Sequence, residues 1–357
     1  MTAAERLSQW RDATQLYLHP RPLTLLFLGF SSGLPILLVF ASLSFWLREA
    51  GVERSAIGYF SWVALAYAFK WAWAPLVDRL PLPFLTRWLG RRRSWMLLSQ
   101  IAIAAGLTAI AFAEPTEDLT QMAILAVLIA FSSATQDITV DAYRIESADE
   151  RLQAAMAATY MVGYRLAMIT ATAGVLAIAA LFDPDEATYQ QMPWQIAYLT
   201  MAALMSIGIL TTLLSPEPDV IVNGEALAQQ EKVRQWSEQQ AHLPKPLARL
   251  AGWLYIAVAC PFADFVRRYR WHAVIILALI STYRIADIVM GIIANVFYVD
   301  LGFTKAEVAA VTAVPVPVPV TAASTKKTKL LEDPCDVPRS ITTATLGRFV
   351  YQSLGMS

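Results

Sequence analysis

The sequence predicts an all-α membrane protein, and three observations carry this prediction. Hydrophobic residues make up 57% of the 357 positions and charged residues only 16%, against about 25% charged in soluble domains. Several apolar runs reach the roughly 20 residues that a helix needs to cross a hydrocarbon core about 30 Å thick. Lysine and arginine are abundant in some connections and scarce in the next, which is the charge pattern of a multi-pass protein.

Seven transmembrane helices are expected, six of them in an N-terminal bundle over residues 1–214. A polar stretch, 215–270, follows as a cytoplasmic linker, and its part 215–246 holds four prolines among many Glu and Gln residues. The segment 271–311 is expected to hold the first helix of a second bundle. The predicted spans are 23–47, 57–77, 95–113, 121–142, 156–181, 195–214 and 272–298.

One apolar patch in the linker, LAGWLYIAVAC at 250–260, is too short to cross a bilayer and precedes Pro261. We expect it to lie along the inner surface as an interfacial helix. The alternative is an additional span. That alternative would carry Arg267, Arg268 and Arg270 to the side of the membrane that is poor in positive charge.

The distribution of positive charge predicts a cytoplasmic amino terminus. Arginine and lysine are frequent before the first span and after the second, fourth and sixth spans, whereas 114–120 and 182–194 contain neither. Only 48–56 departs from the pattern, with Arg48 and Arg54. Cytoplasmic connections carry the excess of these residues in membrane proteins.

The pattern changes after residue 311. PVPVPV at 315–320 excludes an α-helix and favours extended polyproline geometry. The residues that follow contain no apolar run of spanning length. We therefore expect 312–357 to be an aberrant unstructured tail, and a truncation or reading-frame shift near 311–315 would explain the change.

Several function classes find no support in the sequence. The formal net charge of zero argues against nucleic acid as a partner. Two cysteines and three dispersed histidines suggest no metal site. Hydrolase motifs and a phosphate-binding G-x-x-x-x-G-K are absent from the sequence. We expect a non-enzyme without cofactor or obligate protein partner, embedded in lipid and driven by an ion gradient.

Charged residues at membrane depth are costly and are therefore functional candidates. Arg165 lies about 15 Å into the fifth span by helical rise and has no partner within that span, so it must face a cavity or another helix. Arg284 and Asp287 lie in the seventh span and could either neutralise each other at i,i+3 or serve a function. Lys70, in the second span, could contact substrate or extend to the inner interface.

The fourth span ends in an unusually polar stretch, SSATQDITVDAYRIE at 132–146. Gln136 and Asp137 fall inside the apolar slab and suggest the wall of a wetted cavity. Ala134, Asp137, Asp141 and Arg144 follow one helical stripe. Asp141, Arg144 and Glu146 are expected to pair with the arginine-rich loop at 79–93. In the first span, Gly29 and Gly33 form a G-x-x-x-G packing face.

Two groups of motifs carry a family resemblance. APLVDR (74–79) and GRRRSW (90–95) resemble the loop signature of the major facilitator superfamily, although ten residues separate the halves where the family has one. The resemblance makes Asp78, Arg79, Gly90, Arg91 and Arg92, with Asp141 and Arg144, a gating charge network at the cytoplasmic end. SSGLP (31–35), SSATQDITVDAYRIE and YRIADIVMGIIANVFYVDLGF (283–303) resemble AmpG-type muropeptide permeases.

That resemblance implies the major facilitator fold in the bacterial inner membrane. It also implies proton-driven import of anhydromuropeptides (GlcNAc–anhydroMurNAc peptides) for peptidoglycan recycling, with a link to β-lactamase induction. Gly33, Ala134 and Gln136 match family positions tied to function. Arg165 and Arg284 would pair with peptide carboxylates. Tyr160, Tyr164 and Trp71 would meet sugar rings, and Asp137 or Asp287 would carry the proton.

Two alternatives stay open. The family continues through a complete second bundle, so this chain could be a membrane fragment that does not transport. A related transporter of acyl-CoA or drugs is the alternative at the level of substrate.

Overall fold

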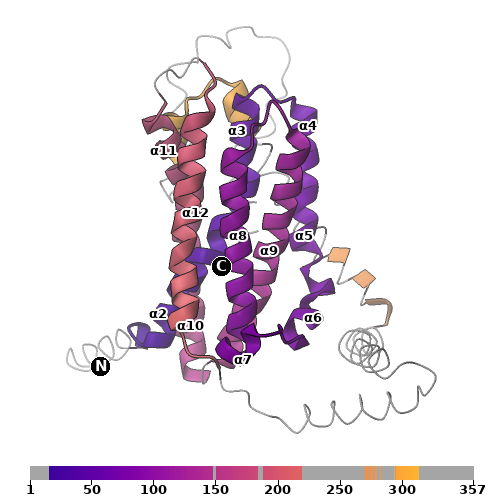
Figure 1. Ribbon diagram of the computed structural model, residues 1–357, viewed down its shortest axis with the longest axis vertical. Coiled ribbons are helices and arrows are strands. Elements are labelled where there is room, and N and C mark those ends of the chain that lie inside the picture. Colours follow the sequence, from indigo (N-terminus) through magenta and orange to yellow (C-terminus); the bar gives the residue numbers. More distant parts are fainter. Residues whose placement is uncertain are drawn as a thin grey trace, which may run out of the picture.

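The fold comes from a computed structural model that describes residues 16–147, 150–183, 188–218 and 295–312, with isolated positions between 270 and 293. Long helices run side by side through its length (Figure 1). Within the described residues, five helices are long and apolar enough to cross a membrane by length and composition. They are Pro20–Glu49 (α2 Pro20–Leu37, η1 Leu38–Ser42, α3 Leu43–Glu49), α8 Arg91–Phe112, α9 Leu119–Glu146, Leu152–Leu181 (within α10 Glu150–Ile169, η4 Thr170–Gly174, α11 Val175–Leu181) and α12 Gln191–Leu214.

These five helices match the first, third, fourth, fifth and sixth predicted spans, whereas the second differs from a single helix. The chain there forms α4 Arg54–Phe60, η2 Ser61–Ala64, α5 Leu65–Ala68, η3 Lys70–Ala72 and α6 Ala74–Arg79. Phe69 and Trp73, with φ near −103° and −108° and ψ near 0°, leave α-helical geometry on either side of η3. Pro75 then restarts the helix at the first turn, where its missing N–H is tolerated.

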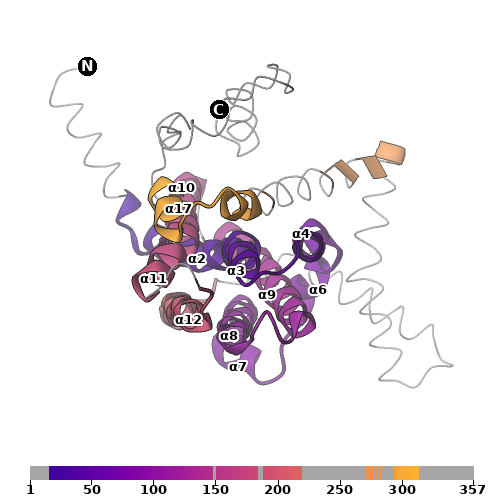
Figure 2. The same cartoon turned by 90° about the horizontal axis from the view of Figure 1, so that it is seen from above.

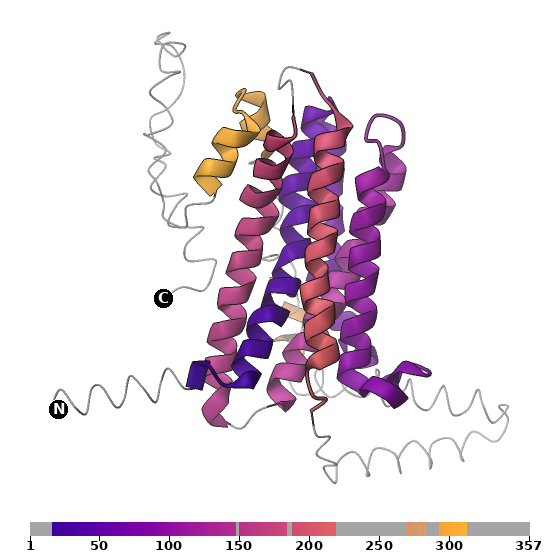
Figure 3. The same cartoon turned by 60° about the vertical axis from the view of Figure 1, so that its left-hand side comes forward.

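The closest helix packing joins α2 to α10. A Cβ added at Gly33 would lie 2.6 Å from the Tyr164 carbonyl oxygen, and one at Gly29 would collide with the Tyr160 carbonyl. From the other side, a Cβ on Gly163 would collide with the carbonyl of Leu26. The G-x-x-x-G motif is therefore a packing face, and Gly163 completes it. Figure 3 shows α2 lying against α10.

Two π-helical segments, η1 and η4, contact each other in mid-bundle. The Ser42 hydroxyl donates to the Ala171 carbonyl, and the Tyr198 hydroxyl donates to the Leu38 carbonyl at 2.9 Å. Farther along, the rings of Trp46 and Trp194 stack at 5.6 Å between centroids. Side-chain hydroxyls therefore satisfy backbone carbonyls that the wider π turns leave available.

The helix α17, Lys305–Thr312, packs on α11 and η4 at the end of the bundle where α3 ends (Figure 2). The short helix α7, Leu85–Leu89, lies at the opposite end (Figure 1). Most of the predicted linker 215–270, Arg284 and Asp287 of the seventh span, and the predicted tail after residue 312 lie outside the described residues.

Candidate functional site

An ion pair joins the broken second segment to the polar stretch of α9. Lys70 Nζ lies 3.7 Å from Asp137 Oδ2, with side chains 37% and 9% exposed respectively. Beside the pair, Trp73 Nε1 donates to Thr135 Oγ1 at 3.2 Å, and the Trp73 ring packs on Phe131. Lys70 therefore has a charged partner on α9, and the break around η3 places it there.

Behind the ion pair, a chain of buried amides and hydroxyls crosses the bundle. Gln136 Nε2 donates to both Ser31 and Ser32 of α2. Gln100 Nε2 donates to Ser31 Oγ at 3.4 Å, and Thr212 donates to Gln100 Oε1 at 2.9 Å. Gln136 is fully buried in this chain, so the prediction that it lines a wetted cavity is wrong. Its amide joins α9 to α2, and Gln100 and Thr212 extend the chain of hydrogen bonds to α8 and α12.

Tyrosines and an arginine on α10 occupy the same depth of the bundle. The Tyr160 and Tyr164 rings are half-buried and tilted, with centroids 6.0 Å apart. Arg165 is also half-buried, and its side chain makes no ion pair or hydrogen bond with the other described residues. Ala134 is fully buried in the core. The proposed sugar and carboxylate contacts of these residues remain predictions.

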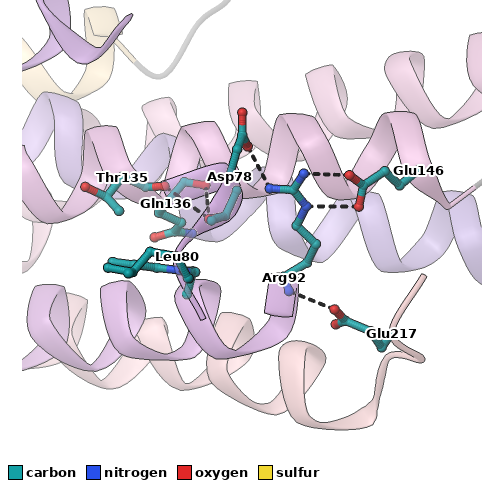
Figure 4. Close-up of polar contacts among 9 residues, drawn as sticks. Asp78, Leu80, Arg92, Thr135, Gln136, Glu146 and Glu217 are labelled. Carbon is teal, nitrogen blue, oxygen red and sulfur yellow. Dashed lines mark hydrogen bonds and ion pairs between the residues drawn. The ribbon is translucent and has the colours of Figure 1, made fainter. Parts of the chain in front are cut away.

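A second network of charges lies at the C-terminal end of α9, as Figure 4 shows. The Arg92 side chain, 7% exposed, donates to Asp78 Oδ1 at 2.7 Å and makes two hydrogen bonds to the Glu146 carboxylate. One buried guanidinium thus ties the ends of α6 and α9 to the start of α8. The predicted pairing of Glu146 with the arginine-rich loop is confirmed.

The other predicted members of this network are placed differently. Asp141 pairs with Arg144 at 3.6 Å within α9, and the predicted pairing of these two residues with the loop at 79–93 stays a prediction. Residues at i,i+3 lie on the same face of a helix, so this pair forms within α9. Arg91 is half-buried, and its Nε makes no hydrogen bond to a described residue. The side chain of Arg79 lies outside the described residues.

Sequence reasoning missed the role of Glu217, three residues beyond the end of α12. Its carboxylate accepts from the backbone N–H groups of Arg92 at 2.8 Å and Arg93 at 3.0 Å, at the N-terminus of α8. Gly90, with φ of 86°, precedes this turn, and a Cβ there would collide with the Glu217 side chain. A carboxylate at a helix N-terminus satisfies free N–H groups and suits the helix dipole.

The Lys305 cluster, defined as Glu49, Asp183 and Lys305, was also missed. Lys305 Nζ lies 2.7 Å from Glu49 Oε1 and 2.6 Å from Asp183 Oδ2. The ammonium also lies 5.5 Å from the centroid of the Trp194 ring. The three side chains come from α3, the segment after α11, and α17, so no local sequence pattern connects them.

A second ion pair group flanks the Lys305 cluster. Asp300 lies 2.6 Å from Arg48 Nε and 2.7 Å from Arg54 Nε. Desolvation opposes ionisation of Asp300, but the hydrogen bond and charge of Arg48, aided by Arg54, hold its pKa below the ordinary value. These contacts account for the two arginines that departed from the charge pattern of the connections.

Nearby, the Tyr189 hydroxyl accepts from Trp46 Nε1 at 3.1 Å and donates to Glu114 Oε1 at 3.0 Å. Burial, reinforced by Glu114, raises the pKa of Tyr189 well above its ordinary value, so the phenol stays protonated. Polar side chains from three connections therefore converge at the end of the bundle where α17 docks.

Comparisons with known proteins agree with the family resemblance. Relatives include the "Putative transporter AmpG 4" of Rickettsia felis, 31% identical over 296 residues, which are 83% of this chain and 64% of the relative. The "Anhydromuropeptide permease" of Escherichia coli (strain K12) is 35% identical over 298 residues, 83% of this chain and 52% of the relative. The chain thus spans between about half and two thirds of these curated relatives.

Among solved structures, that of a D-xylose-proton symporter matches with a TM-score of 0.42 and 11% identity, over 80% of this chain and 70% of that one. The sequence model of the Major Facilitator Superfamily matches residues 23–325, which includes the predicted spans and passes the change in pattern at residue 311. By this match over most of its length, the chain belongs to the Major Facilitator Superfamily.

Proposed function

We propose that the chain belongs to a secondary transporter that imports anhydromuropeptides across the bacterial inner membrane, driven by protons. The Escherichia coli relative carries that substrate class in its name. The observation that carries the proposal is the ion pair of Lys70 and Asp137 inside the helix bundle. Ionisable pairs within membrane spans are costly, and they mark substrate or proton paths. The imported fragments would serve peptidoglycan recycling and, through it, β-lactamase induction.

The pair offers a simple exchange of partners. While Asp137 is ionised, it holds the Lys70 ammonium. A proton on Asp137 removes that attraction and frees Lys70, which is partly exposed, to bind a peptide carboxylate of the substrate. The Tyr160 and Tyr164 rings, on the helix α10, would pack against the sugar rings. Proton binding and substrate binding would thus favour each other.

Binding of a GlcNAc–anhydroMurNAc tripeptide to the purified chain tests this exchange. We expect the affinity to rise as the pH falls from about 8 to about 5, because the proton on Asp137 releases Lys70. Asp137→Asn should bind with little dependence on pH, and Lys70→Gln should bind at least about tenfold more weakly, a loss near 1.4 kcal/mol. Calorimetric titration at several pH values measures all three.

Asp141→Asn is the matched control, since Asp141 lies one turn farther along α9 and pairs with Arg144 on the same helix. It should follow the parent chain at every pH. If Lys70→Gln bound the tripeptide with the same affinity as the parent, Lys70 would not be part of the binding site. Binding of acyl-CoA or a drug in place of the tripeptide would assign a different substrate.

The same proposal places the α7 end of the bundle in the cytoplasm, because arginine is concentrated there. In a chain with Cys260→Ser and Cys335→Ser, Glu117→Cys in the connection before α9 should react with an impermeant maleimide added to intact spheroplasts. Arg87→Cys in α7 should react only after the membrane is opened. Both positions are exposed, so access to the side of the membrane decides the result. The reverse pattern would overturn the orientation.

A further inference from the structure

The residues between the two halves of the loop signature, 80–89, present two aromatic side chains on the outside of the molecule. Trp88 is 89% exposed and is the most exposed large hydrophobic side chain among the described residues, and Phe84 is 82% exposed. These two lie four positions apart, whereas Leu85 and Leu89 are half-buried, and α7 contacts α8. The short helix therefore has a half-buried leucine side and an exposed aromatic side.

The backbone before α7 explains this arrangement. Pro83 has no N–H group and cannot continue the preceding helix. Trp95 Nε1 donates to the Leu80 carbonyl at 2.8 Å and holds the start of the segment on α8. Phe84 then has φ of 67° and ψ of −54°, and the Leu85 N–H donates to the Pro83 carbonyl at 2.8 Å. This is a γ-turn of the rare, strained kind, and it starts α7 with an aromatic ring exposed.

The segment lies at the level where the membrane ends. The helix α8 contains 22 residues, which is about 33 Å of helix against a hydrocarbon core of about 30 Å. Its first residue, Arg91, and its last residue, Phe112, therefore lie near the two interfaces. Only Gly90 separates α7 from α8, and Figure 2 shows α7 at the edge of the bundle beside the end of α8. Tryptophan rings gather at this depth of a bilayer.

Positive charge accompanies the aromatic rings. Residues 80–93 include four arginines and no acidic residue. Arg87 is exposed and makes no ion pair or hydrogen bond with another described residue. The carboxylates of Asp78, Glu146 and Glu217 are held by the start of α8. The charge of Arg87 is therefore available to an anion outside the protein.

We propose that α7 is a membrane-surface anchor that binds an anionic phospholipid. Phe84 and Trp88 enter the interfacial layer of the bilayer beside α8, and Arg87 binds the headgroup phosphate. Apolar rings together with a basic side chain are the chemistry by which a short amphipathic segment lies in an interface, and a guanidinium pairs well with phosphate. Under the orientation proposed above, the lipid is in the cytoplasmic leaflet, whose surface is negatively charged.

Fluorescence quenching in vesicles tests where α7 lies. The full chain with Cys260→Ser and Cys335→Ser is placed in phosphatidylcholine vesicles and carries a bimane on Trp88→Cys, where this apolar ring system replaces the indole. Lipids with a nitroxide near the headgroup quench a probe that lies among them, and iodide quenches a probe in water. We expect quenching by the lipid and protection from iodide. A probe on Glu117→Cys, an exposed position before α9, should give the reverse result.

The choice of lipid tests the role of Arg87. Nitroxide-labelled phosphatidylglycerol should quench the probe at 88 at about one fifth of the mole fraction that labelled phosphatidylcholine requires, from the usual gain per basic residue at an anionic surface. Arg87→Gln should remove most of this preference and leave the probe protected from iodide. Phe84→Ser should weaken quenching by both lipids.

The opposite end of α8 supplies the matched control. Phe112 is 62% exposed, and the connection that follows it, 113–118, contains no arginine or lysine. A probe on Phe112→Cys should be quenched by both lipids without preference for phosphatidylglycerol.

Strong iodide quenching at 88 without quenching by either lipid would overturn the proposal, since α7 would then lie in water, as a surface for a soluble protein would. Equal quenching by the two lipids at 88, or an equal preference at 112, would overturn the recognition of anionic lipid. Arg87 and Trp88 are exposed, so their substitution should leave folding intact. The measurement needs no substrate, so failure of the tripeptide to bind would count against the proposed function alone.

Discussion

Gly163→Ala is expected to destabilise the bundle more than any other single methyl group added to it. The new Cβ would collide with the Leu26 carbonyl, and it would also lie 2.9 Å from the Phe30 nitrogen. Neither neighbour is a side chain that can rotate away, so α2 and α10 must separate. We expect a cost of about 3 kcal/mol or more, at or above the upper end of ordinary overpacking, and a melting temperature lower by at least about 5 °C.

Thermal unfolding of the detergent-solubilised chain measures this effect, and the same chain contains its control. Gly58 in α4 has no atom within 4 Å of an added Cβ. Gly58→Ala should therefore leave stability unchanged or raise it slightly, because alanine favours helix more than glycine does. Equal melting temperatures for the two variants would mean that α2 and α10 do not pack this closely.

Arg92→Gln is the second substitution with a large expected effect. It removes the cation between Asp78 and Glu146 and leaves their carboxylates near each other without a counter-ion. Removal of one partner from a buried pair costs about 3–5 kcal/mol. Since both carboxylates are more than a third exposed, we expect about 2 kcal/mol here.

A double-mutant cycle separates this interaction from a general loss of folding. Arg92→Gln combined with Glu146→Gln should recover part of the stability, because the second change removes the uncompensated charge. Arg87→Gln, at an exposed arginine of α7, should be neutral. Strict additivity of the two changes at 92 and 146 would contradict the network.

The long apolar helices could be predicted from sequence because hydropathy and length decide them almost alone. The break around η3 could not be predicted. Phe69 and Trp73 leave α-helical geometry, but phenylalanine and tryptophan are compatible with a helix, so the sequence gives no sign of the break. The G-x-x-x-G motif of Gly29 and Gly33 predicts a helix-packing face. Gly163 has no such motif, and only its place opposite Leu26 reveals its role.

The charged residues divide in the same way. The sequence predicts that Glu146 pairs with the arginine-rich loop because it ends a helix on the same side of the membrane as that loop. Its ion pair with Arg92 confirms this prediction. A polar side chain inside a span, such as that of Gln136, can either contact water in a cavity or form hydrogen bonds to another helix. The sequence cannot distinguish these cases, because the bonding partners Ser31 and Ser32 lie on a different helix. Lys305 meets residues 49 and 183, a coincidence in space that no spacing in sequence encodes.

The paired π segments give the bundle an adjustable register. Each π hydrogen bond spans one residue more than an α hydrogen bond, so a π segment accommodates one additional residue in the helix. If η1 returned to α geometry, everything beyond it would rotate about the axis of α3 by about 100° and advance by about 1.5 Å. Glu49 stands seven residues beyond the end of η1, so that rotation would swing its carboxylate out of reach of Lys305. The one additional residue accommodated by η1 thus determines the direction in which the Glu49 side chain points, two turns farther along the helix.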